Sequence, residues 1–174
     1  MNDQWYFFTE NKGLTAVGQP PAGSRPFMQT SPELSARDRL PLHRSFATWG
    51  QHQRSPGIVT PQRIWLGQDD NVIFRFENGD RPTMQSAVGA HAGLAAWLVL
   101  LDKFVETQTL LTEAAQIWPV NDMAGALAFV SSAFLPRPLL SLAPNNWERV
   151  ARSLSIHIAN SPRQHVDARN AVSH

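Results

Sequence analysis

The sequence contains no cysteine, and this absence excludes several kinds of chemistry at once. Disulfide bonds, thiol nucleophiles, iron–sulfur clusters and cysteine-ligated zinc all require a cysteine side chain. Charged residues are also scarce, at 17% of the chain against roughly 25% in an average soluble protein. Because 43% of the residues are hydrophobic, this composition indicates a chain that folds around a core.

Long hydrophobic runs and export signals are missing as well. The longest apolar run, from Leu94 to Leu101, is far shorter than the roughly 18 residues that a membrane-spanning helix needs. The first residues lack the basic and apolar regions of a secretory signal peptide. We therefore expect no membrane association and a cytoplasmic location.

The first half of the chain, residues 1–82, predicts two β-hairpins. Aromatic and aliphatic residues at 5–9 and 14–17 flank a turn-like sequence, and a second such pair occupies residues 62–66 and 72–77. Both turns are rich in Gly, Asn and Asp or Lys, which interrupt the β-prone runs on either side. This half is therefore expected to supply the β-structure of the fold.

Between the hairpins, residues 18–41 contain five prolines, which remove backbone donors and predict an irregular segment. Ser31 is placed as the N-cap of one short helix within it, because Pro follows at the first helical position. Leu42, Phe46 and Trp49 then recur at the spacing of one helical face. The sequence therefore predicts a second short helix here.

The second half of the chain, residues 83–160, predicts three helices, at 92–118, 121–135 and 145–159. Asn145 with Glu148 three residues later has the spacing of a capping box. The predicted fold is thus a single α+β domain over residues 1–160, in which N-terminal β-hairpins and a Pro-rich irregular segment pack on a C-terminal three-helix layer. Residues 161–174 are polar and are expected to form a tail.

Charge is distributed unevenly along the chain, although the total is only +1. Residues 25–63 carry six arginines against two acidic residues, whereas residues 64–148 have a net charge of −5. Arginine provides a planar group that binds carboxylates, phosphates and aromatic faces. The basic block also contains Phe27, Phe46 and Trp49, so it mixes the residue types that are enriched at the centres of protein–protein interfaces.

We therefore predict a non-enzymatic interaction protein, an adaptor or a subunit of a larger protein complex. The residues expected to contact the partner are Arg37, Arg39, His43, Arg44, Phe46, Trp49 and Arg54. The alternative is a subunit that contacts RNA or single-stranded DNA, since aromatic side chains stack on bases and arginines bind phosphates. The sequence leaves the identity of the partner and the oligomeric state open.

A small enzyme is the third hypothesis, and no motif in the sequence carries it. The six histidines lack metal-ligand spacing, and the nucleophile pattern G-x-S-x-G is absent. Residues 89–93 are rich in glycine but lack the lysine and spacing of a phosphate-binding loop. We predict no metal and no cofactor. The enzyme hypothesis would gain support if His43 or His91 lined a pocket with a carboxylate and had a shifted pKa.

Overall fold

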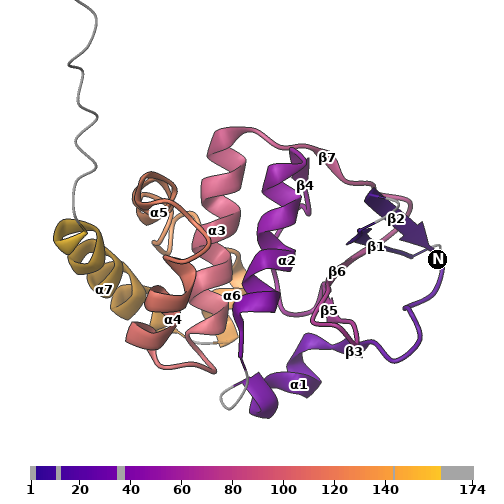
Figure 1. The fold of residues 1–174 in the computed structure, drawn as a ribbon, viewed down its shortest axis with the longest axis horizontal. Coiled ribbons are helices and arrows are strands. Elements are labelled where there is room, and N and C mark those ends of the chain that lie inside the picture. The colour runs from indigo at the N-terminus through magenta and orange to yellow at the C-terminus, as the bar shows by residue number, and fades with distance from the viewer. Residues whose placement is uncertain (1–2, 11–12, 35–37, 143, 162–174) are drawn as a thin grey trace, which may run out of the picture.

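The computed structural model describes residues 3–10, 13–34, 38–142 and 144–161, and it confirms the α+β fold. A five-stranded antiparallel sheet lies on one side and a group of helices on the other (Figure 1). The strands of the described residues are β1 (Gln4–Thr9), β2 (Gly13–Val17), β3 (Arg25–Pro26), β4 (Arg54–Ser55), β5 (Ile64–Leu66), β6 (Val72–Phe76) and β7 (Thr83–Met84). Their helices are α1 (Phe27–Leu34), α2 (Leu40–Gln51), α3 (Ala87–Leu101), α4 (Thr107–Ala114), α5 (Val120–Leu127), α6 (Arg137–Leu142) and α7 (Asn146–Asn160).

The sheet has the order β2-β1-β6-β5-β3, and it confirms both predicted hairpins. The two hairpins join through β1 and β6, where Tyr6 lies opposite Phe74. A separate ribbon of two short strands pairs β4 with β7, so that Arg54 lies opposite Met84. This ribbon connects the end of α2 to the start of α3, at the upper edge of Figure 1.

The helix predicted over residues 92–118 is two helices, α3 and α4, separated by residues 102–106. Glu106 begins α4, because its carboxylate accepts hydrogen bonds from two backbone N–H groups of the first turn. The apolar pattern of the sequence does not reveal this break, because Val105 in the connection is buried like the helical residues on either side. The prediction of one continuous helix was therefore wrong.

The helix predicted over residues 121–135 ends at Leu127 as α5, and a further short helix, α6, follows Pro136. In the connection between α5 and α6, the rings of Phe129 and Phe134 pack edge to face with centroids 5.4 Å apart. Apolar residues therefore pack there without helical structure. The second half of the described chain thus forms five helices, where the sequence predicted three.

Two predicted helix starts also differ from the structure. α1 begins at Phe27, four residues before the predicted cap Ser31, because the fully buried Phe27 packs against the aromatic rings of α3 and the α3–α4 connection. α7 begins at Asn146 as expected, but the side chain of Asn145 makes no capping hydrogen bond. The polar tail was predicted over residues 161–174, and all of it except Ser161 lies outside the described residues.

Helix α2, predicted from its apolar spacing, lies between the sheet and the other helices (Figure 1). Trp49 packs against Phe8 and Phe74 of the sheet, with ring centroids 5.2 and 5.1 Å apart. Phe46, one turn earlier on the same face, lies 6.3 Å from Phe74 and stacks on Trp97 of α3, with centroids 4.4 Å apart and planes within 2°. The aromatic residues of α2 thus belong to one core shared by both halves.

Polar contacts also fix α2 on the sheet. The Ser45 hydroxyl donates a hydrogen bond to the side-chain oxygen of Asn71 at 2.9 Å and accepts one from the Val72 backbone N–H at 2.7 Å. The Asn71 side chain in turn donates to the Phe8 carbonyl at 3.1 Å. Ser45, which lies close to His43 in the sequence, is therefore held in a structural network that joins α2, β1 and the β5–β6 turn.

The C-terminal helices are joined by a buried carboxylate at the end of α3. The Asp102 side chain is fully buried and accepts hydrogen bonds from the Thr107 hydroxyl and from the Arg149 guanidinium of α7, each at 2.5 Å. Removing one partner of a buried carboxylate leaves an uncompensated charge in the interior. Arg149 is thus the contact through which α7 stabilises the α3–α4 junction.

Within the described residues, no helix has the length and apolar character needed to cross a lipid bilayer.

We expect Arg149→Ala to lower the free energy of unfolding by roughly 1–3 kcal/mol, because Asp102 loses its charged partner. Urea denaturation followed by circular dichroism measures this change. Arg152→Ala removes an equally charged, exposed residue from the same helix and should change stability by less than about 0.5 kcal/mol. Equal stability of the two variants would show that the Asp102 contact is unimportant.

Candidate functional site

A cleft of about 480 Å³ opens between α2 and α3, and its remaining wall comes from the α4–α5 connection and the start of α5. This volume falls within the range of pockets that hold small molecules or inserted side chains. The described residues that line it are Phe46, Ala47, Trp49, Gly50, Gln51, Pro56, Gln85, Ala87, Ala90, His91, Leu94, Ile117, Trp118, Pro119 and Asp122.

Small residues explain why the cleft forms at this end of the two helices. Ala47 and Gly50 of α2 line it together with Ala87 and Ala90 of α3, so each helix has two small residues that leave space between them. Further along, the stack of Phe46 on Trp97 fills the space between the helices. The glycine-rich stretch at residues 89–93 accordingly lies within the first turns of α3, beside the cleft.

His91 and Asp122 form the polar end of the cleft. The Nε2 atom of His91 lies 3.6 Å from a carboxylate oxygen of Asp122, which is in the first turn of α5. The imidazole lies directly against Gly125, where an added Cβ would come within 3.0 Å of three ring atoms. The missing side chain at Gly125 therefore provides the space that His91 occupies.

Gln85 adds a hydrogen-bond acceptor to the cleft. Its side-chain oxygen is buried and has no hydrogen-bond partner among the described residues. The side chain lies beside Gly50 and Gly93, where an added Cβ would make ordinary contact with its amide. A buried polar atom without a partner is costly in free energy. This oxygen is thus available to a ligand that donates a hydrogen bond.

The structure places the predicted contact residues in different environments. Phe46 and Trp49 line the cleft but are only 7% and 1% exposed, so they form wall and core at once. Arg44 on α2 and Arg54 on β4 are exposed, and Arg54 lies on the ribbon next to the cleft. Arg37 lies outside the described residues. That these residues contact a partner stays a prediction.

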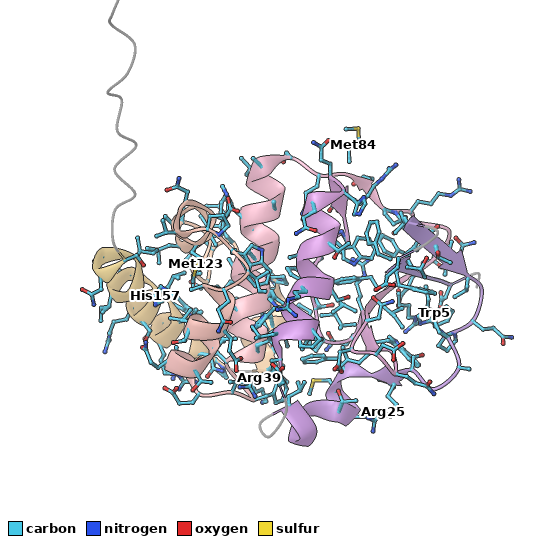
Figure 2. The ribbon with its side chains drawn as sticks, viewed as in Figure 1. Trp5, Arg25, Arg39, Met84, Met123 and His157 are labelled. Carbon is cyan, nitrogen blue, oxygen red and sulfur yellow. The ribbon has the colours of Figure 1, made fainter. Side chains whose placement is uncertain are left out.

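Arg39 and His43 lie in the interior, below the cleft, and Figure 2 shows Arg39 near the start of α2. The Arg39 guanidinium donates two hydrogen bonds to the Glu113 carboxylate of α4, at 2.8 and 2.5 Å, and a third to the Leu34 carbonyl at 2.6 Å. His43 is fully buried, and its Nδ1 accepts a hydrogen bond from the Trp97 indole at 3.1 Å. Both side chains therefore stabilise the packing of α2.

Burial, and secondarily the positive charge of Arg39, lowers the pKa of His43 from 6.5 to about 4. The hydrogen bond from Trp97 also favours the neutral imidazole. Protonated Nδ1 would be a donor facing the donor N–H of the indole, and the hydrogen bond would be lost. The Nε2 atom of His43 lies 3.9 Å from a Glu113 oxygen, too far for a hydrogen bond. His43 is thus neutral in the folded protein near pH 7.

The enzyme hypothesis required one histidine that both lines a pocket beside a carboxylate and has a shifted pKa. In the structure these two properties belong to different histidines. His91 lines the cleft beside a carboxylate, whereas His43 has the lowered pKa but does not line the cleft. No serine, threonine or lysine occurs among the described residues that line the cleft. In the described ranges, no three His, Asp or Glu side chains converge as metal ligands would.

Of the polar residues of the cleft, the sequence analysis named only His91, as a condition of the enzyme hypothesis, and it missed Asp122 and Gln85 as site residues. His91 and Asp122 are 31 positions apart and carry no shared motif, and Gln85 lies in a short connection between elements. The one available signal was the run of small residues at 89–93, which was considered for phosphate binding.

Comparison with protein-family models, with curated proteins and with solved structures finds no match for this chain.

The free energy of unfolding should fall as the pH is lowered from about 6.5 to about 4. Over this range the unfolded chain binds a proton at position 43 and the folded chain does not, so protons favour unfolding. One pKa unit corresponds to about 1.4 kcal/mol, and the full loss is about 3 kcal/mol.

Urea denaturation at pH 7 and pH 5 tests this expectation. The His43→Asn variant keeps an acceptor for the Trp97 indole and cannot titrate in this range. The natural chain should therefore lose about 2 kcal/mol more than the variant between the two pH values. An identical pH dependence of both proteins would contradict the assignment of a buried, neutral His43.

Gly125→Ala should displace the His91 ring from Asp122 while preserving the fold. The new methyl group would overlap the imidazole, which lies at the end of a partly exposed side chain and can rotate away. The His91 ring resonances should shift in NMR spectra. Gly93→Ala, whose methyl group has room, is the control and should leave those resonances in place. Unchanged His91 signals in both variants would contradict the close contact between the His91 ring and Gly125.

Proposed function

We propose that this chain is an interaction protein that receives a short segment of a partner protein in the cleft between α2 and α3. The observation that carries the proposal is the combination of this cleft with an apolar rim. The rim comprises three strongly exposed large hydrophobic residues that lie near lining residues in the sequence: Met84 at 75%, and Val88 and Ile58 each at 62%. Met84 and Val88 directly adjoin the lining residues Gln85 and Ala87 along the chain, and Ile58 is two residues from Pro56.

Single exposed hydrophobic residues are ordinary, but their grouping is informative. The described part of the chain has six large hydrophobic residues that are exposed, and three of them lie within two residues of a lining residue of this cleft. Arg54, one of the arginines predicted to contact a partner, lies opposite Met84 on the ribbon. An aromatic-lined pocket with an apolar rim and a nearby arginine has the composition of a protein-binding hot spot.

The nucleic-acid alternative receives less support from the same geometry. The three aromatic residues of the basic block, Phe27, Phe46 and Trp49, are buried in the core, so their faces are not available for stacking on bases. Arg44 and Arg54 remain exposed, but arginines without exposed aromatic residues carry no preference for single strands. We therefore base the proposal on a protein partner.

Photo-crosslinking in the native host tests the proposal. Benzoylphenylalanine is placed at position 84 in one variant and at position 156 in another, because Met84 and Ile156 are both exposed hydrophobic residues. Met84 lies on the cleft rim at the top of Figure 2, whereas position 156 is on α7, next to the labelled His157. Position 84 should give one covalent adduct of defined mass, and position 156 should give none.

A second substitution connects the adduct to the cleft. Ala90→Trp fills the cleft from α3 and should abolish the adduct at position 84 while circular dichroism stays unchanged. Equal adducts at positions 84 and 156, or no adduct at either, would overturn the proposal. An adduct that nuclease removes would overturn it in favour of the nucleic-acid alternative.

A further inference from the structure

We propose that the partner inserts a basic side chain, arginine or lysine, into the cleft, with Asp122 as its counter-charge. This inference rests on the proposed function and names the chemistry of the group recognised. Among the described lining residues, Asp122, which lies beside His91, is the only Asp, Glu, Lys or Arg. These residues therefore include no lysine or arginine that would repel a cation. The charge of the cleft is therefore complementary to a positive group.

The walls of the cleft suit an organic cation. Trp118, which is partly exposed, contributes an aromatic ring to the wall, and a guanidinium or ammonium group near an aromatic face gains electrostatic attraction from the ring. Leu94 and Ile117 supply aliphatic surface that the methylene stem of a long basic side chain can cover. Arginine and lysine combine a charged end and an apolar stem, as these walls require.

The unpartnered oxygen of Gln85 supports the same assignment. A guanidinium or ammonium group carries several N–H donors, so it can satisfy this buried acceptor and also pair with Asp122. An acidic side chain would be repelled by the Asp122 carboxylate. An apolar side chain would leave the Gln85 oxygen unpaired and would remove water from Asp122 without compensation. A basic side chain is the occupant that can both pair with Asp122 and donate to the Gln85 oxygen.

An NMR titration with two blocked amino acids tests the inference on the full chain. The first probe is acetyl-L-arginine N-methylamide, and the second is the citrulline analogue, which has nearly the same shape and no charge. The arginine probe should shift the indole N–H signal of Trp118 and the amide signals around His91. It should bind about tenfold more tightly than the citrulline probe, as expected for one charged contact.

Two matched substitutions identify the counter-charge. Asp122→Asn should reduce binding of the arginine probe to the level of the citrulline probe. Asp69→Asn removes one negative charge from an exposed turn between β5 and β6 and should leave binding unchanged. Equal affinity for the two probes, equal weakening by the two substitutions, or no shift at Trp118 would each overturn the inference.

The crosslinking experiment separates this inference from the proposed function. An adduct at position 84 without binding of the arginine probe would keep the cleft as a protein-binding site and overturn the basic occupant. Binding of the probe without an adduct at position 84 would overturn the partner protein as the source of the cation. An adduct that disappears in the Asp122→Asn variant and persists in the Asp69→Asn variant would support both.

Discussion

The stack of Phe46 on Trp97 is the contact on which the arrangement of the two halves depends. Phe46 belongs to α2, which is fixed on the sheet by Trp49 and Ser45, and Trp97 belongs to the most deeply buried helix of the other half. Parallel rings at 4.4 Å set both the separation and the orientation of the two helices. The cleft exists because the Phe46–Trp97 stack fills the space between the two helices on one side only. Toward the end of α2 and the start of α3, small residues leave that space open.

Buried polar groups surround this stack and make its position specific. The indole of Trp97 needs an acceptor, which His43 provides, and the Arg39–Glu113 pair lies next to that histidine. Each of these groups would be costly in the interior without its partner. A sliding movement of α2 along α3 would break them together. The rigid base that they form holds the cleft walls at a fixed distance.

The sequence predicted elements whose signals are local. The hairpins follow from turn residues between β-prone runs, and α2 follows from the spacing of Leu42, Phe46 and Trp49. The break at residues 102–106 could not be predicted, because buried apolar residues continue through it and Glu106 caps the next helix without a strong motif. Most of the candidate site escaped prediction because His91 and Asp122 come together only after α3 and α5 pack, at a glycine that periodicity does not mark.

The position of α2 also bears on how the molecule can come apart. Neither the sheet nor the C-terminal helices enclose their own aromatic residues without this helix, since Phe46 of α2 packs against both Phe74 and Trp97. Melting of either half should therefore uncover the other, and we expect the two halves to unfold together. A proteolytic cut in the β4–β7 region would separate two fragments that each expose a large apolar surface. Neither half is therefore expected to remain folded when it is separated from the other.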